Sequence, residues 1–186
     1  MTSILKVDSI QNAAGSVSVP VMAGAIIQVQ SFDKLDDQVI IGLSFDDVMS
    51  VSITPTSTTS KILVKCDINI SASTAINGTT GSRYSAVKLY RDSTQIGLNT
   101  SILSSQSQVW FSCNSVQGTN SGYNQMNSSG SFMDAPATTS AITYKIQAGN
   151  THAASAYTYI NRTPVNTNGA LIHRGISNIT VMEIAQ

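Results

Sequence analysis

The strongest constraint on the fold of this chain is a two-residue alternation of apolar and polar side chains in two long segments. A period of two is typical of a strand with one buried face, and the β-branched and aromatic residues in both segments favour a strand over a helix. We predict that these two strands lie at the centre of a two-sheet core. Their apolar positions are Ile62, Val64, Cys66, Ile68 and Ile70 in the first segment, and Ile142, Tyr144, Ile146 and Ala148 in the second.

Shorter alternating segments, separated by turn residues, surround these two strands. They fall near residues 25–30, 48–54, 83–91, 94–98, 108–113, 156–160 and 175–184. Neither an amphipathic helix nor a fixed internal repeat is present, so the pattern predicts an all-β antiparallel β-sandwich of the jelly-roll kind. Two stretches are interpreted as connections: the acidic residues 32–47, and residues 114–130, which are too polar and glycine-rich for a core strand.

Composition limits the partners of the chain. Only 11% of its 186 residues are charged, compared with about 25% in ordinary globular domains, so hydroxyls and amides must coat the surface. The net charge is zero, with a balance of −4 in residues 1–60 and +4 in the remainder. The basic residues are scattered singly, without the cluster that follows a phosphate backbone. We therefore expect no nucleic-acid partner.

The chain divides into an N-terminal segment, residues 1–22, and one domain, residues 23–186. The first segment contains two short extended pieces that cannot bury themselves alone. It has no secretory signal pattern, and no apolar run reaches the length of a membrane span. We expect synthesis in a cytoplasm and no membrane insertion. Cys66 and Cys113 both occupy apolar-phase strand positions and are interpreted as small buried hydrophobic residues.

Residues for catalysis or metal binding are sparse. The two histidines, His152 and His173, are in no recognisable triad motif, and the spacings of zinc sites and phosphate-binding loops are absent. Asp134 and Glu183 are interpreted as strand-end or edge residues rather than as the carboxylate pair of a glycosidase. The sequence therefore predicts that the chain is not an enzyme and has no cofactor and no metal site.

Four segments carry a resemblance to a known group of proteins. They are ILKVDSIQNAAG near the N-terminus, VKLYRDSTQIG, SFMDAPATTSAITYKIQAG in the centre, and GISNITVMEIAQ at the end. They resemble small virion fibre and decoration proteins of tailed bacteriophages, particularly marine and cyanobacterial ones. The resemblance extends from Leu5 to Gln186. It implies a short extended attachment segment, a TNF/C1q-like jelly-roll head, assembly as a homotrimer, and location in the virion in contact with capsid or tail proteins.

Two sets of candidate site residues follow from this interpretation. Leu5, Val7 and Ile10 are predicted to attach the chain to the virion through main-chain strand pairing. Tyr84, Tyr90 and Trp110 are bulky for wet strand faces, and aromatic residues are enriched between subunits, so they are candidate subunit-interface residues. An equally acceptable interpretation is that these three side chains fill the core of one subunit.

The leading functional hypothesis is a non-enzymatic bacteriophage structural protein, either a capsid-decoration protein or a head or tail fibre, made in the cytoplasm of the host bacterium. The alternative is a tail-fibre tip whose loops at residues 77–81 and 114–130 bind host surface glycans. A polysaccharide depolymerase is a third hypothesis, and the sequence offers it no clear carboxylate pair.

Overall fold

The computed structural model of the chain describes residues 22–73, 84–101, 105–114, 121–151 and 154–186. This part of the chain forms strands, one 3-10 turn at Ser121–Tyr123 and no α-helix. The strands are β1 (Ile26–Lys34), β2 (Gln38–Ile41), β3 (Phe45–Ile53), β4 (Lys61–Ser73), β5 (Tyr84–Arg91), β6 (Thr94–Ile96), β7 (Phe111–Asn114), β8 (Met126–Asp134), β9 (Ile142–Asn150), β10 (Tyr157–Ile160) and β11 (Ser177–Ile184).

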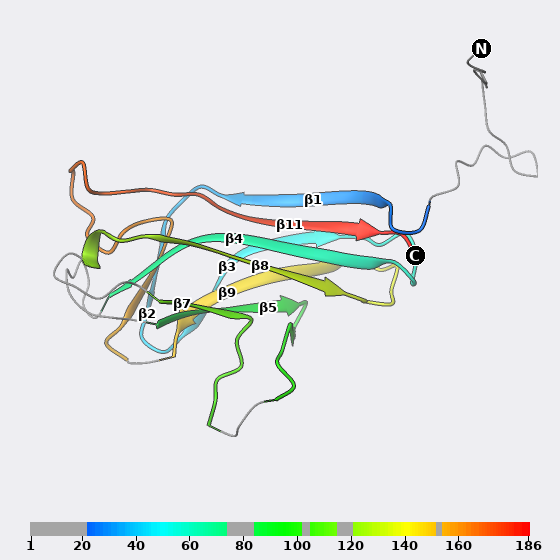
Figure 1. The fold of residues 1–186 in the computed structure, drawn as a ribbon, viewed down its shortest axis with the longest axis horizontal. Helices are drawn as coiled ribbons and strands as arrows, with labels where there is room; N and C mark the ends of the chain where they lie inside the picture. The colour runs from blue at the N-terminus through cyan, green and yellow to red at the C-terminus, as the bar shows by residue number, and fades with distance from the viewer. Residues whose placement is uncertain (1–21, 74–83, 102–104, 115–120, 152–153) are drawn as a thin grey trace, which may run out of the picture.

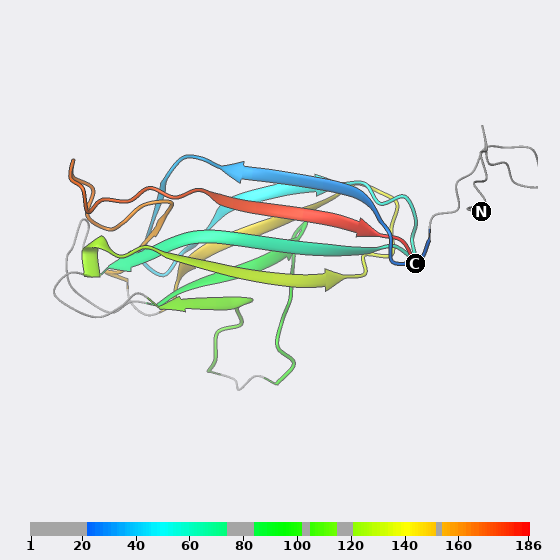
Figure 2. The same ribbon diagram turned by 45° about the horizontal axis from the view of Figure 1, so that its top comes forward.

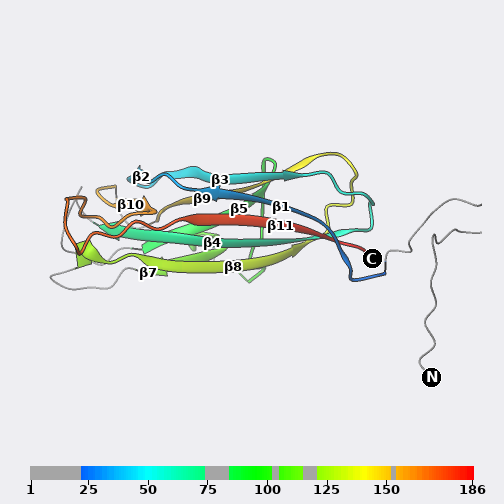
Figure 3. The ribbon, with the colours of Figure 1, turned by 90° about the horizontal axis from the view of Figure 1, so that it is seen from above.

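The strands form two antiparallel sheets, with the long strands running along the long axis of the molecule (Figures 1 and 3). In the first sheet, β4 pairs with β8 on one edge, and with β11 and then β10 on the other. The other outer strands of this sheet, besides β8, are β1, which pairs with β11, and β2, which pairs with β10. In the second sheet, β9 lies between β3 and β5, and both β6 and β7 pair with the far edge of β5.

The strand order is that of a jelly roll. If β1, β3, β4, β5, β7, β8, β9 and β11 are numbered first to eighth, one sheet has the order first, eighth, third, sixth. The other has the order second, seventh, fourth, fifth. This is the double-sheet, double-Greek-key arrangement of jelly rolls. The predicted all-β antiparallel sandwich is therefore confirmed.

The two predicted central strands are also confirmed, since β4 and β9 are interior strands of their sheets. Their predicted apolar faces supply much of the core: the inward residues of β4 from Ile62 to Ile70 are at most 1% exposed, and those of β9 from Ile142 to Ala148 at most 5%. Cys66 and Cys113 are free and buried within this core. Burial raises the pKa of Cys66 to about 12 and also raises that of Cys113, so both thiols stay protonated at neutral pH.

Two predicted connections are wrong. The acidic stretch 32–47 contains the end of β1, all of β2 and the start of β3. In it, Ile40 is only 1% exposed and pairs with Thr158 of β10, so this short strand is fixed by long-range pairing that local composition does not reveal. Residues 126–130, predicted to be loop, form the first half of β8 and pair with β4.

The first and last described residues lie at the same end of the sandwich, as Figure 1 shows. The Gly24 N–H donates to the Ala185 carbonyl at 2.8 Å, and the Ala185 N–H donates to the Ala25 carbonyl at 3.0 Å. Residues 1–21, which hold nearly all of the predicted attachment segment, lie outside the described residues. In the part of the chain that is described, no helix has the length and apolar character needed to cross a membrane.

Candidate functional site

The candidate residues predicted from the sequence are found in three different places. Leu5, Val7 and Ile10 belong to residues 1–21, outside the described part of the chain. Tyr84 and Tyr90 lie on β5 at the outward positions, opposite in phase to the buried Val87 and Leu89. Tyr84 is exposed, whereas Tyr90 is half-buried, with the Lys145 ammonium 5.7 Å from its ring centroid.

Trp110 is not on that face. It is half-buried and packs against the hydrophobic core, with its ring centroid 5.1 Å from that of Phe111. A methyl group at Gly97 would lie 3.2 Å from the indole, and one at Gly130 would lie 3.1 Å from it. Tyr84 and Tyr90 thus lie on the outer face of the second sheet, whereas Trp110 fills space next to β8. An interface role for all three remains a prediction.

A more extended feature lies on the outer face of the first sheet, where β1, β11, β4 and β8 run side by side (Figure 2). The pairing registers align one apolar side chain from each strand in a single row across the sheet. Val29 is 52% exposed and Met133 45% exposed at the two ends, and the residues between them are half-buried. We call Val29, Met182, Leu63 and Met133 the apolar row.

Leu63 is a sequence signal for this row that the alternation of apolar and polar residues did not reveal. Leu63 occupies an outward position of β4, between Lys61 and Lys65, where the pattern otherwise places polar side chains. A single exposed leucine is ordinary. The row becomes visible only when the registers with β8 and β11 are known, because they place Leu63 directly opposite Met133 and Met182.

Polar and charged side chains adjoin the apolar row on the same face. The next row toward the other end of the sheet contains Lys65 and Ser131, and the row after it contains Asp67 and Ser129. A hollow of about 260 Å³ lies between these four residues, because the serine side chains of β8 are small. The exposed apolar row, the hollow and charges of both signs together give this face the features of a protein-interaction surface.

The two carboxylates considered above belong to the same part of the first sheet. Asp134 and Glu183 lie in one cross-strand row of the first sheet, on either side of Ile62, with which both pair. Both side chains are buried, Asp134 at the end of β8 and Glu183 near the end of β11. Glu183 is therefore a strand-end residue as predicted, but β11 is an interior strand and not an edge.

Both carboxylate oxygens of Asp134 are hydrogen-bonded, whereas Glu183 is hydrogen-bonded through Oε1 and its buried Oε2 has no partner among the described residues. Arg91 donates to both carboxylate oxygens of Asp134, at 3.0 and 2.9 Å, and Tyr144 Oη donates to Asp134 Oδ2 at 2.6 Å. Burial raises the pKa of Tyr144, and the hydrogen bond to Asp134 raises it further. Within the described ranges, no group of three or more His, Cys, Asp or Glu side chains is placed to hold a metal ion.

Two of the three comparisons with known proteins found no match. No family model and no curated protein matches this chain. Among solved structures it is similar to that of the infectious bursal disease virus Gx strain and to that of the VP2 subviral particle of the same virus, each at 10% identity and a TM-score of 0.39. These matches cover 97% of this chain, but 42% and 43% of the other two, so this chain spans less than half their length. The fold assignment rests on the strand order described above.

Proposed function

We propose that this chain is a non-enzymatic structural protein of a bacteriophage virion, a small trimeric fibre or capsid-decoration protein exposed on the particle surface. The observation that carries the proposal is the apolar row on the outer face of the first sheet. Exposed apolar groups arranged in register across four strands are expensive to leave in water. Contact with a second copy of the chain would remove these apolar groups from water, which favours association.

The charges on this face favour a second copy over a partner of one charge sign. Lys61 and Lys65 on β4 are balanced by Asp67 on the same strand and Asp33 on β1, all at outward positions. In the described residues none of the four forms an ion pair with another side chain. Around a threefold axis each subunit contacts its two neighbours through two different patches. A face that carries both signs in equal number can supply both patches.

Attachment to the particle is assigned to residues 1–22, as the resemblance to phage virion proteins implies. The chain enters the sandwich at the end where the backbone of Gly24 and Ala25 pairs with Ala185. Three copies that share one axis would present three such segments together. Weak strand pairing by each segment would then add up through effective concentration.

The test compares two triple variants by their incorporation into particles. We expect Leu5→Asp, Val7→Asp and Ile10→Asp together to abolish incorporation, while the purified protein keeps its fold and trimeric mass. The matched control places the same three charges at Thr2, Ser3 and Ser9, and should incorporate normally. Full occupancy of the apolar-position variant in purified virions would contradict the attachment role.

Cryo-electron microscopy of the same virions locates the chain. Many copies at regular positions on the head would support decoration or a head fibre, whereas a few copies on the tail would support a tail fibre. Absence of the chain from purified particles would contradict the proposed function as a whole.

A further inference from the structure

A long part of this chain carries no charge at all. Between Asp92 and Asp134 the sequence contains no Asp, Glu, Lys, Arg or His. At the chain average of 11% charged residues, several would be expected in a stretch of this length. The stretch is instead rich in Asn, Gln and Ser, whose side chains both donate and accept hydrogen bonds without a net charge.

Part of this uncharged stretch forms a hollow on the outside of the sandwich. The two described arms of the β6–β7 connection, residues 97–101 and 105–110, project from the second sheet, as the green segments at the bottom of Figure 1 show. Residues of both arms line an open hollow of about 360 Å³, which is within the range of roughly 300–1,000 Å³ for small-molecule sites. The lining residues are Asn99, Ser101, Gln106, Ser107, Gln108 and Val109.

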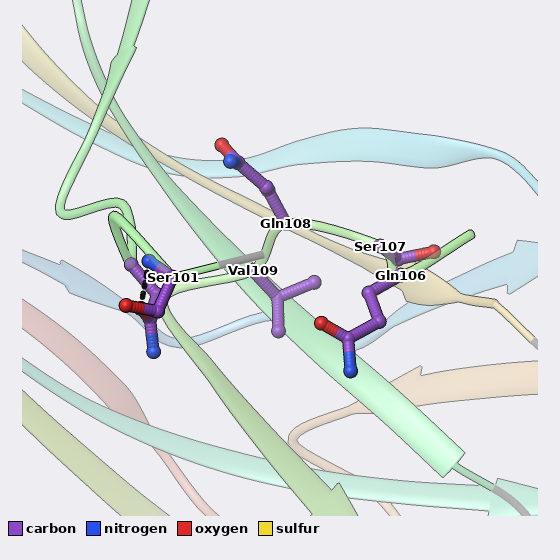
Figure 4. A pocket seen from close by; sticks show the side chains of 6 residues that line it. Ser101, Gln106, Ser107, Gln108 and Val109 are labelled. Carbon is purple, nitrogen blue, oxygen red and sulfur yellow. Dashed lines mark hydrogen bonds between the residues drawn. The ribbon is translucent and has the colours of Figure 1, made fainter. Parts of the chain in front are cut away.

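The walls of the hollow offer polar groups on both sides of a small apolar surface. Figure 4 shows the Val109 side chain between Ser101 on one side and Gln106 on the other. Ser101 and Gln106 are exposed, whereas Val109 is half-buried. A ligand seated on Val109 would therefore meet a hydroxyl and an amide at its two edges.

Hydrogen bonds to the sheet hold one arm of this loop in place. Gln95 Nε2 donates to the Gln108 carbonyl at 3.1 Å, and the Trp110 N–H donates to the Val87 carbonyl at 2.7 Å. On the other arm, Asn99 Oδ1 accepts a hydrogen bond from the Ser101 N–H at 2.7 Å. The backbone next to Val109 is thus held against the sheet without a ligand, which lowers the entropic cost of binding there.

The chemistry of the lining selects an uncharged, hydroxyl-rich ligand. A charged ligand would lose water here without an opposite charge to replace it, which is costly. Two other hollows in the described part of the chain differ in this respect, since one is lined by Lys65 and Asp67 and the other by Asp47 and Lys145. Neighbouring sugar hydroxyls match the paired donor and acceptor of a Gln or Asn amide, and the C–H face of a sugar ring suits Val109.

We infer that the hollow between Ser101 and Gln106, on the β6–β7 loop, binds a neutral oligosaccharide. This site differs from the loops at residues 77–81 and 114–130 that the sequence suggested for glycan contact. It requires neither the apolar row nor the N-terminal segment. A single shallow site of this kind binds weakly, and a trimer would strengthen attachment to a polysaccharide by multivalency.

The inference is tested by saturation-transfer difference NMR on the full chain, with maltohexaose, mannotriose, lactose and triacetylchitotriose as neutral probes and trigalacturonate as an anionic probe. We expect at least one neutral probe to bind at millimolar concentration and trigalacturonate to bind more weakly. The double variant S101A/Q106A should lose binding by about ten-fold or more, the loss expected for one or two hydrogen bonds. The matched control Asn127→Ala removes an exposed amide of the same uncharged stretch, on β8 outside the hollow, and should bind normally.

Three outcomes would overturn the inference: no signal from any neutral probe at 10 mM, equal binding by S101A/Q106A and the wild type, or stronger binding of trigalacturonate. Ser101 and Gln106 are not on the face of the apolar row, so trimer mass and particle incorporation should be unchanged in S101A/Q106A. A failure of glycan binding with normal incorporation would thus reject this site alone. A failure of incorporation in the wild type would reject the proposed structural function without affecting the sugar measurement.

Discussion

The buried side chain of Asp134 shows how a single residue ties the two sheets together. It ends β8 in the first sheet, whereas its partners Arg91 and Tyr144 belong to β5 and β9 in the second. Removing a charge from water costs several kcal/mol unless it is paired and hydrogen-bonded. Here one cation and one hydroxyl satisfy the carboxylate, so Asp134 acts as a cross-sheet link.

The hydrogen-bond partners of Glu183 are uncharged hydroxyl and backbone N–H groups, and they make its contribution to stability depend on pH. Its Oε1 accepts hydrogen bonds from the Thr56 N–H at 2.7 Å and the Thr56 hydroxyl at 2.8 Å. Burial acts to raise the pKa of Glu183, but the side-chain hydrogen bonds of Ser60 and Thr56 and the backbone N–H groups of Thr56 and Ser57 outweigh it. The pKa therefore lies below its ordinary value of 4.5.

A carboxyl whose pKa is lowered by folding stabilises the fold above its unfolded pKa, and this stabilisation is lost as the pH falls through the folded value. We expect Glu183→Gln to lower the free energy of unfolding by about 1 kcal/mol at pH 7, the scale of one hydrogen bond. The difference from wild type should shrink as the pH falls from 5 toward 3. Urea unfolding at pH 7 and pH 3 measures it, and an equal difference at both values would contradict the assigned role.

Among the strands, the contact between β3 and β9 depends on a residue without a side chain. A methyl group at Gly149 of β9 would lie 2.2 Å from the Ser44 carbonyl oxygen and 2.9 Å from the Phe45 ring. The clash is with backbone, so it cannot be relieved by a rotamer change. Phe45 itself pairs with Gly149 at the start of β3.

We expect Gly149→Ala to destabilise the domain by about 1–3 kcal/mol, the usual cost of overpacking. The matched control is Gly169→Ala, where the new methyl group would lie 4.0 Å from its nearest neighbour, a side-chain atom of Ile172. Thermal unfolding of the two variants should show a loss of several degrees for the first and little change for the second. A melting temperature of Gly149→Ala equal to that of Gly169→Ala would show that the backbone can move aside.

The strands also show what can and cannot be predicted from this sequence. Strands β4 and β9 were predictable because their inward positions are apolar without exception over the central residues. The first half of β8 was not, because its inward Ser128 and Gly130 are small or polar. The space there is filled by the rings of Trp110 and Phe111, which would lie 3.1 and 2.7 Å from a methyl group at Gly130, so the usual alternation is lost.

The candidate surfaces were less accessible to prediction than the strands. Alternation places Leu63 on the outer face of β4, but only the register aligns it with Met133 and Met182. Register is determined by long-range pairing of the whole sheet. The hollow beside Gln106 depends in the same way on hydrogen bonds that join the residues before β7 to β6 and to β5.

At the level of the whole molecule, the central expectation is self-association through the apolar row. We expect the wild type to have the mass of three chains in light scattering, and Leu63→Asp to shift it to the mass of one chain. Leu171→Asp is the matched control, because Leu171 is 63% exposed and lies in the β10–β11 connection, away from the row. If Leu63→Asp stays trimeric while replacing Tyr84 and Tyr90 by Ala separates the subunits, the interface lies on the second sheet instead.

The pairing of Gly24 and Ala25 with Ala185 determines where a second protein can be fused to this chain. A fluorescent protein or epitope fused after Gln186 would emerge beside the segment that we assign to attachment and would crowd it. The turns at the opposite end of the sandwich, such as the connection between β10 and β11, are a full strand length away. A protein inserted there would point away from the attachment segment and leave that end of the sandwich free.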